Sequence, residues 1–138
     1  MIQPYFPHLI ADAFIKKDGK YLAIKRTVNV EVGTWEVPGG RVNFGETIEN
    51  ALIREIREET CLKIKINKFL GYGQGLSCPH KDGTTRHRFI LYFECNIASG
   101  KLKLNEYEAK EYKWVTWDEF KKLKPLSKPI KDFFNRFG

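Results

Sequence analysis

The segment from Thr47 to Thr60 limits how this chain can fold, because it contains neither glycine nor proline and has helical periodicity. Its apolar residues recur every three or four positions, as on the buried face of an amphipathic helix. The residues of this face are Ile48, Ala51, Leu52 and Ile56. Glu46 and Thr47 suit the start of a helix, where hydroxyl and acidic groups complement the free N–H groups and the dipole. We therefore predict a helix over residues 47–60.

Short segments rich in β-branched and aromatic residues lie on both sides of this helix. We predict strands over residues 8–17, 20–26, 34–40, 63–73 and 85–97. Asp18 and Gly19 separate the first two segments and favour a hairpin turn. The last of the five segments has so continuous an apolar centre that we expect it in the middle of a sheet.

Two further helices are predicted near the C-terminus, over residues 116–123 and 127–137. Thr116 or Asp118 suits the start of the first, and Ser127 suits the start of the second. No internal repeat and no linker interrupts the chain. A mixed sheet flanked by helices, an α/β or α+β sandwich, is the simplest architecture for this order of elements.

The composition is that of a globular protein, with 138 residues of which 42% are hydrophobic. We expect a single domain over residues 1–138. The net charge of +7 suits an anionic partner, such as a phosphorylated small molecule, nucleic acid or a membrane surface. No apolar run approaches the length of about 18 residues that suggests a membrane span. Three widely spaced cysteines argue against a disulfide framework, so we expect a cytoplasmic protein.

Three glutamates lie along one margin of the predicted helix. On a helical wheel Glu55, Glu58 and Glu59 fall within about 100° of one another, beside the apolar stripe. Crowding anions there is unfavourable, since they repel one another and lose hydration. A pair between Arg54 and Glu58 would offset only about 0.5 kcal/mol. A bound divalent cation compensates better, and hard oxygen ligands favour Mg²⁺ or Mn²⁺.

The spacing around this helix resembles the Nudix box of the MutT-like hydrolases. Gly40 is followed after five residues by Glu46, and after seven more by the run from Arg54 to Leu62, so the box covers about residues 40–62. Cys61 stands where the family has a glycine that ends the helix in a left-handed conformation. This cysteine must accept strain of about 1 kcal/mol, or the helix must end differently. The resemblance implies the Nudix α/β/α sandwich with a mixed β-sheet.

The resemblance also assigns roles to residues of the box. Glu55, Glu58, Glu59 and the Gly40 carbonyl would hold the metal ions. Arg54 would orient the carboxylates, and Glu46 would support the site from the start of the helix. Glu55 is the first choice for the general base. The alternatives, on a predicted loop, are Glu106, Glu108 and Glu111.

Four further residues are candidates for contact with a substrate. Arg26 and Arg41 suit phosphate groups, because guanidinium matches the geometry of phosphate oxygens. Trp35 is a candidate for stacking on a base, and His87 for contact with a phosphate or a sugar.

The activity that the resemblance implies is hydrolysis of a nucleoside diphosphate linked to another group. The stretch "PGGRVNFGET" resembles members that act on nucleoside triphosphates, including damaged ones. ADP-ribose or a nucleotide sugar is the alternative substrate. Two weaker alternatives are a module that binds nucleotide or RNA without turnover and a hydrolase of RNA 5′ ends. A monomer and a homodimer are both compatible with the sequence.

Overall fold

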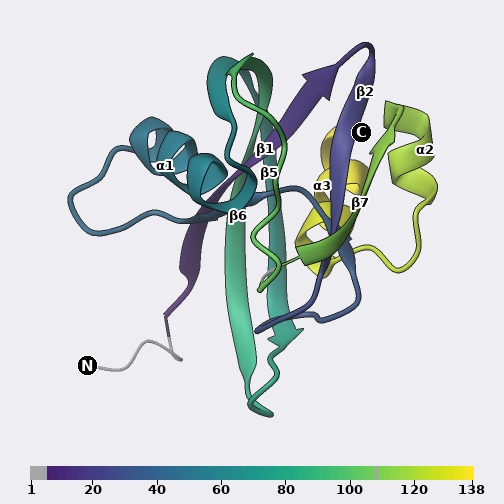
Figure 1. Cartoon of the computed structure of the whole chain (residues 1–138). Coiled ribbons are helices and arrows are strands. Elements are labelled where there is room, and N and C mark those ends of the chain that lie inside the picture. Colours follow the sequence, from purple (N-terminus) through teal and green to yellow (C-terminus); the bar gives the residue numbers. More distant parts are fainter. Residues whose placement is uncertain (1–5, 108) are drawn as a thin grey trace.

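The computed structural model describes residues 6–107 and 109–138 of the chain (Figure 1). The strands are β1 (His8–Lys17), β2 (Lys20–Arg26), β3 (Trp35–Glu36), β4 (Gly39–Arg41), β5 (Lys63–Pro79), β6 (Thr85–Ser99) and β7 (Ala109–Val115). The helices are α1 (Ile48–Thr60), α2 (Trp117–Lys122) and α3 (Lys128–Phe137). None of the helices in the described part of the chain is long and apolar enough to span a membrane.

The strands form one mixed sheet in the order β3-β2-β1-β6-β5, with β4 paired to β1 and β7 paired to β2. The pair β1–β6 is parallel, whereas the other pairs are antiparallel. Strand β6 therefore lies inside the sheet, between β1 and β5, as its continuous apolar centre predicted. The predicted fold class, an α/β/α sandwich with a mixed sheet, is confirmed.

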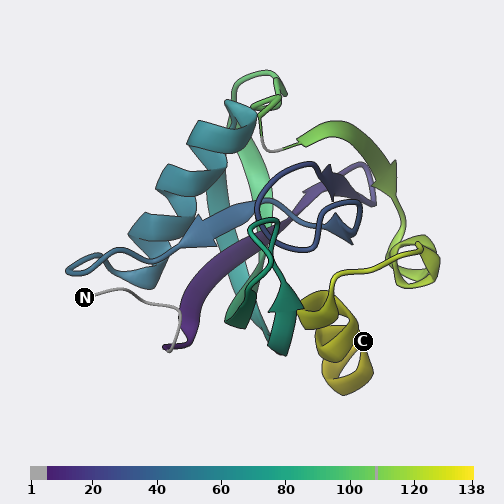
Figure 2. The ribbon, with the colours of Figure 1, turned by 90° about the horizontal axis from the view of Figure 1, so that it is seen from below.

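Helices cover both faces of the sheet, and Figures 1 and 2 show α1 and α3 on opposite sides of it. Alternate residues of β1 supply the two cores, because successive side chains of a strand point to opposite faces. Ala13 packs in the cluster that contains Leu52 and Ile56 of α1. Phe14 packs in the other cluster, with Phe133 of α3. Both faces of β1 are thus buried over most of its length.

Three parts of the sheet differ from the prediction. Strand β5, predicted over residues 63–73, runs on to Pro79. The segment 34–40 forms two short strands on either side of Pro38, because β3 pairs with β2 whereas β4 pairs with β1. Residues 109–115, predicted as loop, form β7, where Trp114 is opposite Leu22 of β2. Five residues of β7 are exposed or half-buried, so its sequence carries little of the apolar alternation that identifies a strand.

The helix starts agree with the sequence, but α3 is capped differently. Thr47 caps α1, and its side chain accepts a hydrogen bond from the Asn50 N–H at 3.1 Å. Ser127 is the N-cap residue of α3, yet its side chain makes no capping hydrogen bond. The Lys128 N–H instead donates to the Glu31 carboxylate at 2.8 Å. A carboxylate distant in sequence therefore completes this helix end.

Cys61 ends α1 in the left-handed conformation, with φ of 62° and an N–H that donates to the Arg57 carbonyl at 3.0 Å. The helix therefore keeps the end that a glycine would favour, and the cysteine Cβ bears the strain. Its side chain is exposed and adds no packing to the core.

Cys61→Gly is expected to raise the free energy of unfolding by about 0.5–1 kcal/mol, because glycine removes the Cβ clash. The greater entropy of glycine in the unfolded chain offsets part of the gain. Urea unfolding of the two proteins measures the difference. Cys61→Ala is the matched control, since it removes the thiol but keeps the Cβ and should give no gain. Equal stability of the glycine and alanine variants would contradict this account.

Candidate active site

A cavity of about 900 Å³ opens where β1, β4 and α1 meet. One wall consists of Gly39, Gly40 and Arg41 of β4 together with Glu55 and Glu59 of α1. Gly40 of the box and two of the box glutamates therefore face the same space. A further part of the lining comes from the end of β2, the loop after it and the β5–β6 hairpin. Its residues include Arg26, Asn29, His80, Arg86 and Arg88.

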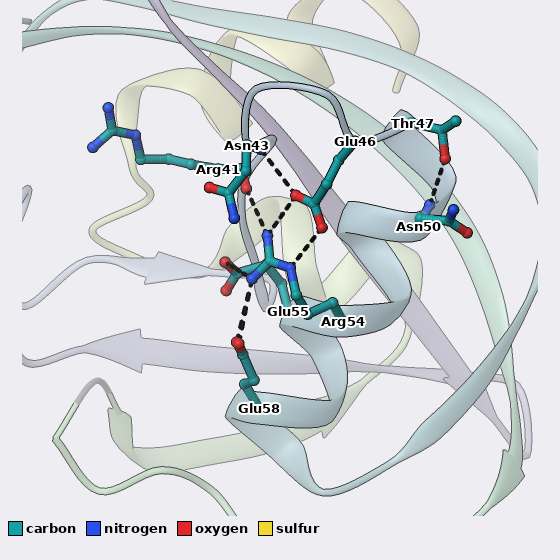
Figure 3. A network of polar contacts seen from close by, with 8 residues as sticks. All are labelled: Arg41, Asn43, Glu46, Thr47, Asn50, Arg54, Glu55 and Glu58. Atoms are coloured by element: carbon teal, nitrogen blue, oxygen red, sulfur yellow. Dashed lines mark hydrogen bonds and ion pairs between the residues drawn. The ribbon is translucent and has the colours of Figure 1, made fainter.

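Arg54 links the carboxylates beside this cavity (Figure 3). Its guanidinium group donates to Glu46 at 2.7 and 2.8 Å, to Glu55 at 2.8 Å and to Glu58 at 3.3 Å. It also donates to the Arg41 carbonyl at 3.2 Å. One side chain therefore joins the loop before α1 to two successive turns of the helix. The predicted pair of Arg54 with Glu58 is confirmed.

The charges in this network are mutually stabilised. The side-chain hydrogen bond from Arg54, followed by the backbone hydrogen bond from Asn43, lowers the pKa of Glu46 to about 2. The hydrogen bonds to Glu46 and Glu55 in turn raise the pKa of Arg54 above its ordinary value. Glu46 therefore stays ionised at neutral pH. It binds Nε and Nη2 of Arg54, whereas Glu55 binds Nη1.

The two glycines of β4 allow the backbone to approach carboxylates closely. The Gly39 N–H donates to the Glu59 carboxylate at 2.6 Å. A Cβ at Gly40 would overlap the carboxylate of Glu55, and a Cβ at Gly39 would overlap that of Asp12. Any larger residue at either position would force β4 away from these carboxylates.

A buried charged network adjoins the cavity, and its residue Arg88 lines it. The Arg88 guanidinium, only 3% exposed, donates to Glu31 at 3.0 Å and to Glu36 at 3.1 Å. The Tyr92 hydroxyl also donates to Glu36, at 3.3 Å. Burial alone would lower the pKa of Arg88, but the charges of Glu36, Asp12 and Glu31 outweigh it and raise that pKa. Arg88 therefore stays charged although it is buried.

Asp12 lies between this network and the wall of glutamates. Burial, and after it the charge of Glu36, raises the pKa of Asp12 well above its ordinary value, although Arg88 acts in the opposite direction. Sequence reasoning missed Asp12, Glu31, Glu36 and Arg88. Three of them could have been found from the sequence. Asp12, Glu36 and Arg88 are charged residues next to apolar residues in predicted strands, and a charge in such a position suggests a buried polar site.

A model of the NUDIX domain matches residues 7–137. The chain belongs to the Nudix family. The match includes every residue that lines the cavity and all three helices.

Named relatives share this Nudix domain. The ADP-ribose pyrophosphatase of Methanocaldococcus jannaschii is 38% identical over 128 residues, which cover 92% of this chain and 73% of that protein. The nucleoside triphosphatase NudI of Escherichia coli is 36% identical over 108 residues, covering 73% of this chain and 76% of that protein. The crystal structure of the MutT protein from Methanosarcina mazei Go1 has a TM-score of 0.78 and 26% identity, covering 95% of this chain and 92% of the other. This Nudix protein is therefore a hydrolase, as the box predicted.

Nudix hydrolases generally depend on divalent metal ions, and the hard oxygen donors beside the cavity suit Mg²⁺ or Mn²⁺. Within residues 6–107 and 109–138, no three acidic, histidine or cysteine side chains are already arranged as a metal site. Arg54 instead holds Glu55 and Glu58 by hydrogen bonds. The carboxylates of Glu55 and Glu59 lie on successive turns of α1, beside the glycine backbone of β4. These oxygen donors are of the kind that a hard cation prefers.

The two arginines predicted to contact phosphate both line the cavity. Arg41 follows the glycines of β4, and Arg26 ends β2, where its Nε donates to the Val30 carbonyl at 2.8 Å. Arg86, which sequence reasoning missed, also lines the cavity and is held by Asp82 at 3.1 Å. The cavity of this Nudix domain therefore has both cationic groups and carboxylates in its lining.

Trp35 does not line the cavity, and the prediction that it stacks on a base is corrected. Its ring is only 4% exposed and packs in the core on the α3 face of the sheet. The Nζ atoms of Lys25 and Lys113 lie 5.7 and 5.1 Å from its ring centroid. A substrate in the cavity cannot reach this ring.

His87 is also placed away from the cavity, because side chains of β6 alternate between the two faces of the sheet. Its neighbours Arg86 and Arg88 line the cavity, whereas His87 does not. Its predicted contact with a substrate is therefore not supported by this cavity. The residue type suggested the right strand but the wrong face.

The alternative bases of the predicted loop lie outside the cavity where the structure describes them. Glu106 is exposed, and Glu111 lies on β7 at 3.9 Å from Lys25. Neither lines the cavity. Glu108 lies outside the described residues. Glu55, the first choice, does line the cavity.

Proposed function

We propose that this Nudix hydrolase cleaves a pyrophosphate bond in a nucleoside triphosphate and releases the monophosphate, with Mg²⁺ or Mn²⁺ as cofactor. One observation carries the proposal: Glu55 and Glu59 line the same cavity as Arg26 and Arg86. Carboxylates suit cations, and guanidinium groups suit phosphates. A polyphosphate with its cations complements both kinds of group at once.

The metal ligands in this proposal are the box glutamates Glu55, Glu58 and Glu59, together with the Gly40 carbonyl. When bound, the divalent cation supplies positive charge against the phosphate oxygens and makes the attacking water more acidic. The Glu58 side chain is 54% exposed and its contact with Arg54 is long, at 3.3 Å, so it is free to turn toward a cation. Arg54 keeps the remaining carboxylates in place through its short bonds to Glu46.

Glu55 is the proposed general base. Its carboxylate lines the cavity, where it can accept a proton from the water that attacks phosphorus. Arg26, Arg41 and Arg86 then orient the phosphates and stabilise the charge on their oxygens. Most of the catalysis in this scheme is positioning and charge stabilisation, as expected for attack on a phosphate anhydride.

ADP-ribose is the second candidate substrate, because the relative with 38% identity is an ADP-ribose pyrophosphatase. The relative with 36% identity is a nucleoside triphosphatase. The two relatives therefore act on different classes of substrate, and their names alone do not choose between the two candidates. A module that only binds nucleotide is less well supported. Clustered carboxylates weaken the binding of a polyanion unless a cation joins them.

A panel of nucleotides tests the proposal. Nucleoside triphosphates, ADP-ribose and a nucleotide sugar are incubated with Mg²⁺, and the release of monophosphate, phosphate and pyrophosphate is measured. We expect the highest kcat/KM on a nucleoside triphosphate, with release of pyrophosphate and monophosphate. Higher kcat/KM on ADP-ribose would select the second candidate instead.

Removal of metal is expected to lower the rate by at least about 100-fold, because the cation neutralises the phosphates. The panel is repeated with a chelator in excess and then with Mn²⁺ restored. Recovery on adding Mn²⁺ is the control for damage by the chelator. Activity undiminished by the chelator would contradict the metal-dependent mechanism.

A further inference from the structure

Phe44 is an aromatic residue whose exposure the proposed mechanism does not explain. It lies on the loop between β4 and α1, lines the cavity, and has a relative exposure of 108%. A ring that is fully exposed at the edge of a binding cavity is available to a bound ligand, and contact with an apolar part of that ligand would remove its surface from water. Apart from two histidines, it is the only aromatic side chain that lines the cavity within the described part of the chain.

The loop that carries Phe44 is held on both sides. The Val42 N–H donates to the Leu9 carbonyl at 3.0 Å, before the ring. After it, the Glu46 N–H donates to the Asn43 carbonyl at 3.0 Å, and the Asn43 N–H donates to the Glu46 carboxylate at 2.9 Å. Phe44 therefore sits at the tip of a closed turn, and its exposure is not the result of a frayed segment.

The same loop is tied to the catalytic carboxylates. Arg54 donates to both Glu46 and the Arg41 carbonyl, the residues on either side of this turn (Figure 3). The same guanidinium group donates to Glu55. The position of Phe44 relative to the reacting end of the cavity is therefore set by this network.

We propose that Phe44 stacks on the nucleobase of the bound nucleotide and so selects nucleotides over base-free polyphosphates. This inference rests on the proposed function. An aromatic ring stacks well on another flat π-system, and the base is the only such part of a nucleotide. Arg41, three residues earlier, faces the same cavity for the phosphates. Stacking tolerates different bases, so the site accepts more than one and favours the larger purine rings.

The inference is tested by comparing a nucleotide with a ligand that lacks a base. Binding of the nucleoside monophosphate product and of inorganic pyrophosphate, each with Mg²⁺, is measured by calorimetry. We expect Phe44→Ala to weaken nucleotide binding about tenfold, within the range of stacking contacts, and to leave pyrophosphate binding unchanged. Phe44→Trp should retain nucleotide affinity, because it keeps a flat ring.

Phe69→Ala is the matched control. Phe69 is 55% exposed on β5 and does not line the cavity, so its loss should leave both affinities unchanged. Unchanged nucleotide affinity in Phe44→Ala would overturn the inference, as would equal losses for nucleotide and pyrophosphate. Nucleotide binding by the wild type without hydrolysis would overturn the proposed function alone. No nucleotide binding by the wild type would overturn both.

Discussion

Glu55→Gln is expected to lower kcat by about 10³-fold, which corresponds to about 4 kcal/mol of transition-state stabilisation. Glutamine keeps the shape of the side chain but removes the charge that holds a cation and the group that accepts a proton. The variant should fold normally, because Arg54 keeps its two short bonds to Glu46. Steady-state kinetics on the best substrate of the panel, together with circular dichroism, measures both properties.

Glu49→Gln is the control for this loss of charge. Glu49 is exposed in the first turn of the same helix and does not line the cavity. Its kcat should stay within about twofold of the wild type, although the lost interaction with the helix dipole lowers stability by about 0.3–1 kcal/mol. If the two variants had equal kcat, Glu55 would be excluded as base and as essential metal ligand.

Arg88→Met is expected to lower the free energy of unfolding by about 3–5 kcal/mol. The change removes the guanidinium group that lies 3.0 Å from Glu31 and 3.1 Å from Glu36. Both carboxylates would then be buried without their counter-charge, and Glu31 and Glu36 are only 6% and 0% exposed. Such a loss is a large part of the 5–15 kcal/mol that stabilises a typical domain. Thermal unfolding should show a fall in Tm of roughly 10–20 °C.

Two further variants show whether the unpaired charge is the cause. Adding Glu31→Gln and Glu36→Gln to Arg88→Met should recover part of the stability, because the uncompensated charges are removed. Arg136→Met removes an arginine paired with Asp132 at 3.0 Å, but 42% of that side chain is exposed, so we expect a loss of at most about 1 kcal/mol. If Arg88→Met were no less stable than Arg136→Met, the network would not be a determinant of stability.

The box residues show how far local sequence reasoning reaches. Spacing along one helix places Glu55 and Glu59 on the same margin, and the structure brings both to one cavity with Gly40. The pairing of Arg54 with Glu58 is equally local, since it joins residues one helical turn apart. The bonds of Arg54 to Glu46 were not predictable in the same way, because they depend on how the loop before α1 folds back.

Two of the four substrate candidates show where this reasoning fails. Trp35 and His87 have suitable chemistry, but the residue type does not tell which face of a strand is buried or which faces a cavity. Arg86 and Arg88 lie on either side of His87 in sequence and face the cavity instead. A shift by one residue along a strand exchanges the two faces, so an error of one position moves a candidate out of the site.

The sequence by itself determined the helices, most of the strands and the acidic margin, because helical and strand periodicities and capping are properties of neighbouring residues. Only the tertiary structure decided that β7 pairs with β2 and that Glu31 both caps α3 and binds Arg88. These contacts join segments far apart in the chain. Their partners are chosen by the packing of the whole sheet, which no local pattern encodes.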